Sequence, residues 1–144
     1  MTKHLFLLLL FFCSTTQGTH STSGSELVIE VNGLRNNIGH VRLGLFNNSE
    51  KFLDVPYLKA VAEIKDKKAV IIFKNLKPGN YAVGLLHDEN GNEEMDYNWV
   101  GIPKEGYGIS NNTSMKLKKP SFQESSFEVK ANQKKTVQVK MIYF

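Results

Sequence analysis

Short runs in which apolar and polar residues alternate recur along this chain, and they limit its fold more than any other feature. Clear examples lie at 27–31, 41–45, 81–85 and 127–130, and a compact β-branched run lies at 69–73. Alternation with a period of two places every second side chain on one face of a strand. We count about six or seven strands and no regular helix–strand alternation, which argues against a parallel α/β sheet. The chain is predicted to be all-β: an antiparallel β-sandwich with immunoglobulin-like or transthyretin-like geometry and one or two short helical turns.

Turn signals suggest how some of these strands connect. The first two runs are separated by Asn-Gly and Asn-Asn-Ile-Gly sequences, which predict a β-hairpin over 26–46. Pro78-Gly79 predicts a tight turn. Tyr81 follows it directly, so we expect its hydroxyl to reach back to the preceding backbone, as in a tyrosine corner.

Two segments are less regular. Residues 48–54 are compatible with one helical turn, and 55–65 fits either a short helix or a strand. Residues 88–124 are rich in glycine and contain two prolines, so they predict one long irregular insertion. A loop of this length in a compact domain is usually functional or carries small elements of its own.

The N-terminus has the organisation of a signal peptide. A basic start is followed by the eight apolar residues Leu5–Phe12 and then by small polar residues. Eight residues are too short to cross about 30 Å of hydrocarbon as a helix, so no transmembrane segment is expected in the mature chain. We predict cleavage after Gly18, a disordered linker over 19–25 and a single domain over 26–144. The mature protein would be periplasmic or extracellular.

A lipid anchor at Cys13 is the alternative to cleavage. Phe12 precedes this cysteine, where a lipoprotein signal has a small residue. Cys13 is the only cysteine, so its removal would leave a domain that cannot rely on disulfides. The formal charge is +4, and it is +3 without residues 1–18, which hold one lysine and no acid. Such a mild excess argues against a nucleic-acid-binding protein.

Several motifs stand in a recognisable order. They are Leu34-Arg35-Asn36 with Gly39, Leu76-x-Pro78-Gly79-x-Tyr81-Ala82-Val83, His87-Asp88-Glu89-Asn90-Gly91-Asn92, and the segment Gly101–Asn112. Over roughly residues 26–143 this order and spacing resemble the bacterial family called domain of unknown function 2141. The resemblance implies an exported bacterial protein and brings no agreed activity. The family's acidic loop usually has glycine where this chain has Glu93.

Oxygen-bearing residues follow the strand at 81–86 at every second position, which is the spacing of ligands in calcium loops. The predicted metal ligands are Asp88, Asn90, Asn92, Glu94 (through its carbonyl) and Asp96. Two features depart from a calcium loop: Glu93 stands at the sixth position, where glycine is usual, and Trp99 stands at the twelfth, where a bidentate glutamate is usual. Calcium is thus a possible cofactor of modest affinity. The competing interpretation is a polar hairpin tip, because Asn-Gly is a strong turn signal.

Aromatic and charged residues follow within the same long loop. The predicted ligand- or partner-binding residues are Tyr97, Trp99, Lys104, Glu105 and Tyr107. Aromatic faces beside polar groups are typical of binding surfaces. These aromatics could instead pack against the sandwich as part of an Ω-like loop. An envelope protein or a glycan would be the partner.

Catalysis finds little support. There is no Gly-x-Ser-x-Gly motif, and the mature domain has no cysteine. His87, Asp88 and Glu89 together suggest a small periplasmic hydrolase or lyase, but adjacent residues of a strand point to opposite faces. We therefore predict no catalytic residues and a non-catalytic envelope module with a binding or structural role. The hydrolase or lyase is the alternative.

Overall fold

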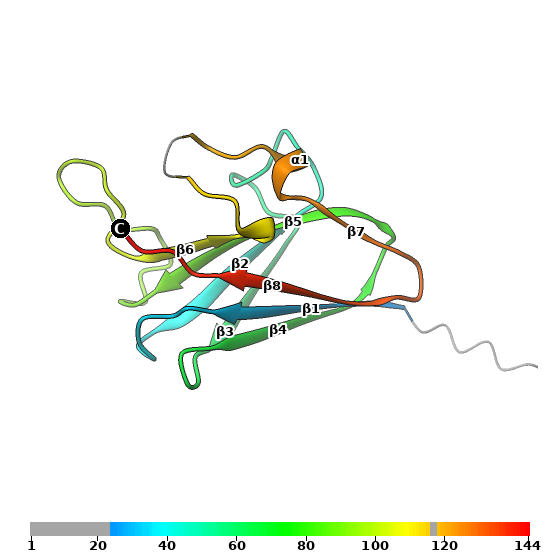
Figure 1. Ribbon diagram of the computed structural model, residues 1–144, viewed down its shortest axis with the longest axis horizontal. Helices are drawn as coiled ribbons and strands as arrows, with labels where there is room; N and C mark the ends of the chain where they lie inside the picture. The colour runs from blue at the N-terminus through cyan, green and yellow to red at the C-terminus, as the bar shows by residue number, and fades with distance from the viewer. Residues whose placement is uncertain (1–23, 116–117) are drawn as a thin grey trace, which may run out of the picture.

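The computed structural model describes residues 24–115 and 118–144 (Figure 1). The predicted signal peptide, Cys13 and most of the predicted linker lie outside the described residues. The described elements are β1 (Ser25–Asn32), β2 (His40–Phe46), β3 (Leu58–Glu63), β4 (Ala69–Leu76), β5 (Gly79–Asp88), β6 (Gly106–Ile109), η1 (Ser110–Asn112), α1 (Phe122–Ser125), β7 (Phe127–Val129) and β8 (Lys134–Lys140).

The strands form two sheets that pack face to face, so the predicted all-β sandwich is confirmed (Figure 1). One sheet has the order β4-β1-β8. The other has the order β3-β2-β5-β6, with β7 also paired to β5. One pair departs from the expected antiparallel pattern, because β1 runs parallel to β8. In the described part of the chain, no helix is long and apolar enough to span a membrane.

The core lies between the inner faces of the two sheets. Alternate residues of the central strands supply it, among them Leu27, Ile29, Val31, Val41, Leu43, Leu45, Val83 and Leu85. Fully burying one such side chain stabilises the fold by about 1.5–3 kcal/mol. The Tyr81 hydroxyl donates to the Lys77 carbonyl oxygen at 2.7 Å, which confirms the predicted tyrosine corner.

The predicted hairpin over 26–46 is wrong. β1 pairs with β4 and β8, whereas β2 pairs with β3 and β5, so the intervening chain crosses from one sheet to the other. Period-two alternation shows which side chains a strand buries, but two strands that pair and two strands that face each other have the same pattern. Gly39 ends the crossing with φ +71°, and a Cβ there would lie 2.0 Å from the Asp88 carbonyl oxygen. Only glycine can therefore occupy this position.

The ambiguous segments are now assigned. The segment 55–65 contains strand β3, and residues 48–54 form turns rather than a helix. The insertion at 88–124 is less irregular than predicted, because it contains β6, η1 and α1. Helix α1 begins with a capping box between Ser121 and Glu124.

A second apolar cluster covers part of the outer face of the larger sheet. We call it the outer cluster; it consists of Phe46, Phe52, Ala82, Tyr107 and Ile109, with Leu53, Met95, Met115, Phe122 and Ile142 packed against them. The segments before β3 and after β6 supply most of the covering side chains. Because this cover is incomplete, part of the sheet's outer face stays open beside it.

Candidate functional site

The polar residues of the sequence motifs gather at one end of the sandwich, where β5 ends and the long loop begins. Asp88, the last residue of β5, has a fully buried side chain. Its carboxylate accepts hydrogen bonds from Arg42 Nε at 2.5 Å, Gly91 N at 2.8 Å and Glu93 N at 3.1 Å. Burial by itself would raise the pKa of Asp88, but the hydrogen bonds from Arg42 and the two amides together hold it below its usual range.

This geometry changes the interpretation of the predicted calcium loop. Both Asp88 oxygens are used, and the side-chain oxygens of Asn90 and Asn92 accept from the amides two residues further on. The amide nitrogens of Asn90 and Asn92, not their oxygens, face Asp96, at 2.6 and 3.3 Å. In this arrangement the side-chain oxygens of Asp88, Asn90 and Asn92 all accept hydrogen bonds within the protein.

Two further observations concern the same loop. Among the described residues, no group of three or more His, Cys, Asp or Glu side chains is placed to hold a metal ion. Glu93 has φ +71°, in the left-handed region that favours glycine. This chain therefore has glutamate at a position whose backbone conformation suits the glycine of the family pattern. The polar residues form a structured loop, and calcium binding stays a prediction.

His87 is also fully buried, on the opposite face of β5 from Asp88. Its Nε2 lies 2.8 Å from the Ile38 carbonyl oxygen, and its Nδ1 lies 2.7 Å from the Tyr143 hydroxyl. A carbonyl oxygen can only accept, so Nε2 carries the hydrogen, and in the neutral imidazole Nδ1 then accepts from Tyr143. The Tyr143 hydroxyl in turn accepts from the Arg35 backbone amide at 3.2 Å.

Glu89 has different partners again. It forms an ion pair with Arg35 and accepts from Asn36 Nδ2 at 2.6 Å. The Arg35 hydrogen bond is the main reason that the pKa of Glu89 lies below its usual range. Glu89 is 3.8 Å from His87 Nδ1, but Asp88 faces the other side of the sheet. The three residues of the hydrolase or lyase alternative thus do not converge on one cleft, and two of them are buried.

Glu105 connects the two ends of residues 88–96, which we call the acidic loop. It is 4% exposed, and its carboxylate accepts from the amides of Glu89 at 2.9 Å and Asp96 at 3.4 Å. The Arg35 guanidinium also donates to the Lys104 carbonyl oxygen at 3.1 Å and lies over the Tyr143 ring. We call Arg35, Glu89, Glu105 and Tyr143 the clamp. The expectation that Glu105 lies on an exposed binding surface is corrected: its carboxylate holds the loop in place.

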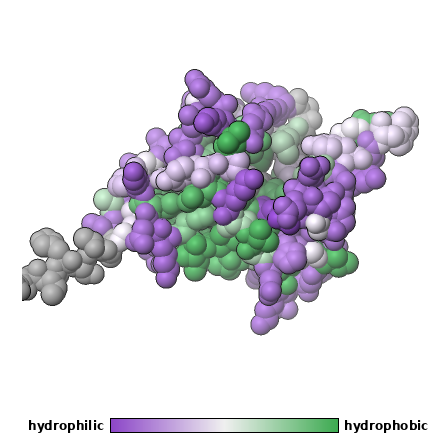
Figure 2. Space-filling view, turned by 180° about the vertical axis from the view of Figure 1, so that it is seen from behind, coloured by the Kyte–Doolittle hydropathy of each residue, from purple (hydrophilic) through white to green (hydrophobic). Residues whose placement is uncertain are grey.

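Residues 97–103, which we call the aromatic hairpin, project away from the sandwich beyond the clamp (Figure 1; Figure 2 shows the opposite side of the molecule). Tyr97 bridges to Pro103, and the Asn98 amide donates to the Ile102 carbonyl oxygen at 2.9 Å. The Asn98 side-chain oxygen also accepts from the amides of Val100 and Ile102, at 3.0 and 2.9 Å. These bonds fix the backbone without using the large side chains.

The predicted binding residues of the loop fall into two groups. Trp99 is 96% exposed and Tyr97 is 57% exposed, and Lys104 is also exposed. Tyr107, in contrast, is 1% exposed and belongs to the outer cluster. Tyr107 therefore packs against the sandwich, as the second interpretation expects, whereas a binding role for Trp99 and Tyr97 stays a prediction.

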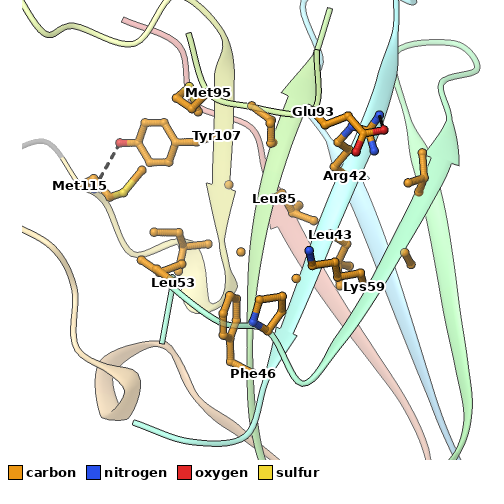
Figure 3. Close-up of a pocket in the computed structure, with 18 of the residues that line it drawn as sticks. Arg42, Leu43, Phe46, Leu53, Lys59, Leu85, Glu93, Met95, Tyr107 and Met115 are labelled. Carbon is orange, nitrogen blue, oxygen red and sulfur yellow. Dashed lines mark hydrogen bonds and ion pairs between the residues drawn. The ribbon is translucent and has the colours of Figure 1, made fainter. Parts of the chain in front are cut away.

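A groove of about 400 Å³ lies on the outer face of the larger sheet, beside the outer cluster (Figure 3). At its floor Gly44 of β2 is directly opposite Gly84 of β5. A Cβ on Gly44 would lie 3.0 Å from the Phe46 ring, and one on Gly84 would lie 2.8 Å from Leu53 Cδ2. The two glycines thus allow Phe46 and Leu53 to pack directly on the sheet.

Comparison with known proteins assigns the chain to a family. A family model described as "Uncharacterized protein conserved in bacteria (DUF2141)" matches residues 29–138, well over half of the chain. The chain belongs to the DUF2141 family. Neither a curated protein nor a solved structure gives a significant match. Membership in this uncharacterised family brings no specific role.

Three residues that sequence reasoning missed are central to the site of this DUF2141 protein. Arg42 binds Asp88, Tyr143 binds His87, and Lys59 lies at the groove. The DUF2141 match includes Arg42 and Lys59 but ends before Tyr143. A charged residue within an alternating strand was the only available signal for Arg42, and it does not identify a partner. Lys59 lies in the segment that the sequence leaves open between helix and strand.

Proposed function

We propose that this DUF2141 protein is a non-catalytic binding module of the bacterial cell envelope, and that the aromatic hairpin contacts a protein partner. The observation that carries the proposal is the 96% exposure of Trp99 at the tip of a hairpin with a fixed backbone. Tryptophan and tyrosine are enriched among the residues that contribute most to binding at protein interfaces.

The hairpin is organised for binding before any partner arrives. Its own hydrogen bonds fix residues 98–102, and the clamp holds the acidic loop from which it projects. A rigid loop loses little conformational entropy on binding, so more of the contact energy appears as affinity. The clamp uses buried and charged groups, whereas the tip exposes apolar side chains.

The chemistry of the tip favours a protein over a glycan. Beside Trp99, the side chains of Val100 and Ile102 are 52% and 44% exposed. Sugar-binding sites combine an aromatic face with hydrogen-bonding side chains. Here the side-chain oxygen of Asn98 is already bonded within the hairpin, and Val100 and Ile102 are aliphatic. An aliphatic and aromatic tip instead fits an apolar depression on another protein.

The buried groups support a non-catalytic role. His87 and Asp88 are both fully buried, and each has its polar atoms bound to other groups of the fold. Neither side chain is accessible to a substrate in this arrangement. Export is supported by the organisation of residues 1–18, which is that of a signal peptide.

Photo-crosslinking in the bacterium that carries the chain tests the proposal. A benzophenone amino acid would replace Trp99, and in a control chain it would replace Thr136, which is exposed on the smaller sheet. We expect a discrete protein adduct from position 99 and none from position 136. The substitution Val100→Asp, combined with the crosslinker at 99, should remove the adduct because it places a charge in the apolar contact.

Trp99 is also the only tryptophan, so its fluorescence reports on the hairpin alone. With the purified partner, its emission should shift to shorter wavelengths and become protected from acrylamide. Equal crosslinking at 99 and 136 would contradict the proposal. Protection of Trp99 by purified peptidoglycan without any protein adduct would also contradict it, in favour of a glycan.

A further inference from the structure

We propose that the groove on the outer face of the larger sheet binds a small amphipathic anion, namely an aliphatic monocarboxylate such as a free fatty acid. Of the aromatic hairpin, Tyr97 lines this groove, but the inference does not depend on the hairpin's partner. The inference rests on the shape of the groove, its apolar walls and one cation, Lys59, whose side chain has no ion pair or hydrogen bond among the described residues.

The shape of the groove suits a small molecule. Its volume of about 400 Å³ lies within the range of about 300–1,000 Å³ that ligand pockets occupy. The floor is the backbone of β2 and β5 around Gly44 and Gly84, and the outer cluster forms one wall. A macromolecular segment would need a longer surface than this.

The walls are apolar and adaptable. Phe46, Leu53 and Tyr107 contribute rigid or branched surface, and Met95 and Met115 contribute flexible thioether chains (Figure 3). Methionine side chains fill irregular gaps and adjust to different apolar partners. The Tyr107 hydroxyl is already bonded to the Met115 amide at 3.2 Å, so this wall presents mainly carbon and sulfur. A flexible alkyl chain fits such walls.

One positive charge at the groove, that of Lys59, is available to an anion. Arg42 is bound to Asp88 and Glu93, at 2.5 and 3.0 Å, so its charge is compensated. Lys59 has no ion pair or hydrogen bond through its side chain to any described residue. Its ammonium group points toward the groove (Figure 3). A carboxylate at the end of an alkyl chain would meet this ammonium while the chain lies against Phe46 and Leu53.

Calorimetric titration of the whole domain with decanoate, below the concentration at which decanoate forms micelles, tests the proposal. We expect saturable binding of one decanoate per chain and weaker binding of decanol, which has the same chain without the charge. The substitution Lys59→Met removes the ammonium and keeps the apolar stem, so it should weaken decanoate binding by about fivefold. It should leave decanol binding unchanged.

A matched pair of valines locates the site. Val61 lines the groove and is 54% exposed, whereas Val70 is 56% exposed on the other sheet. Val61→Glu places a negative charge beside the groove and should weaken decanoate binding. Val70→Glu should leave it unchanged, as should Lys77→Met on an exposed turn.

Three results would overturn the inference. The first is the absence of saturable decanoate binding. The second is binding that Val61→Glu and Val70→Glu affect equally, which would place decanoate elsewhere. The third is preference for 2-naphthoate with no binding of decanoate, which would show an aromatic-acid site. All variants should keep the wild-type circular dichroism spectrum, because the substituted side chains are exposed.

Discussion

Arg42 of β2 donates to the buried carboxylate of Asp88 at the end of β5 across a distance of 2.5 Å, although 46 residues separate them in sequence. Arg42 also pairs with Glu93 at 3.0 Å. One guanidinium therefore connects the sandwich to the start of the acidic loop. This places Asp88 in the framework of the loop rather than on its binding surface.

Replacing Asp88 by asparagine should destabilise the fold. The substitution keeps the shape of the side chain, but it removes the charge that Arg42 compensates and puts an NH2 group where one carboxylate oxygen accepts an amide hydrogen. Arg42 is partly exposed and still pairs with Glu93 in this variant. We therefore expect the free energy of unfolding to fall by about 2–3 kcal/mol, less than when a deeply buried pair is broken. Urea unfolding measures it. The control Asp54→Asn, at an exposed pair with Lys119, should show almost no change.

Calcium should not alter the contribution of Asp88 to the stability of the fold. Both of its oxygens already accept hydrogen bonds from the protein, so we expect Asp88 to act on stability through these bonds. We expect Asp88→Asn to lower the melting temperature equally in millimolar calcium and in chelator. A larger loss in calcium would show that Asp88 is a ligand, because a cation bound only by the native state adds its binding free energy to stability.

The stability of the domain should fall in acid. The pKa values of Asp88 and Glu89 are both lowered in the folded chain, so these carboxyls stabilise it fully above their unfolded values near pH 4. That contribution is lost as the pH falls below 4 toward the folded values. The unfolding free energy, measured by urea titration between pH 2.5 and 7, should drop as the pH falls below about 4. In the double variant with Asp88→Asn and Glu89→Gln this drop should be smaller. An unchanged acid profile would show that Asp88 and Glu89 are not the carboxyls responsible for the drop.

The sequence predicted those features that depend on neighbouring residues. Alternation over 81–85 identified the buried face of β5, and the Pro78-Gly79 turn identified the hydrogen bond of Tyr81. The same alternation placed His87 and Asp88 on opposite faces, which holds in the structure. Each of these follows from strand geometry or from a turn within a few residues.

The features that the sequence did not reveal depend on distant residues. Alternation does not specify which strands pair, so the crossing between β1 and β2 was mistaken for a hairpin. The hydrogen bond from Arg42 to the Asp88 carboxylate joins residues far apart in the sequence, and nothing local to Asp88 shows it. Exposure could not be predicted for Trp99 or Tyr107 either, since the outer cluster that buries Tyr107 draws on segments spread from Phe46 to Ile142.

Replacing Tyr143 by phenylalanine should weaken the clamp specifically. The hydroxyl donates to His87 Nδ1 and accepts from the Arg35 amide, and its loss leaves a buried imidazole nitrogen without its donor. We expect a loss of about 2 kcal/mol by urea unfolding. Nitrogen-15 spectra of the wild type should show the hydrogen of His87 on Nε2. The control Tyr57→Phe, at a half-exposed ring, should cost far less, and equal effects would contradict the role of the Tyr143 hydroxyl.

Trp99 and Tyr107 lie in the same loop and should respond in opposite ways to truncation. Trp99→Ala removes a side chain that is 96% exposed, so unfolding in urea should change by less than about 0.5 kcal/mol. Tyr107→Ala leaves a cavity in the outer cluster and should cost about 3–5 kcal/mol. Binding to the partner should depend on Trp99 and not on Tyr107. It should be lost in Trp99→Ala and kept in Tyr107→Phe, which is used here because Tyr107→Ala is too unstable. A Trp99→Ala chain that is strongly destabilised would mean that the tip supports the fold, and it would remove the reason to treat the hairpin as a binding surface.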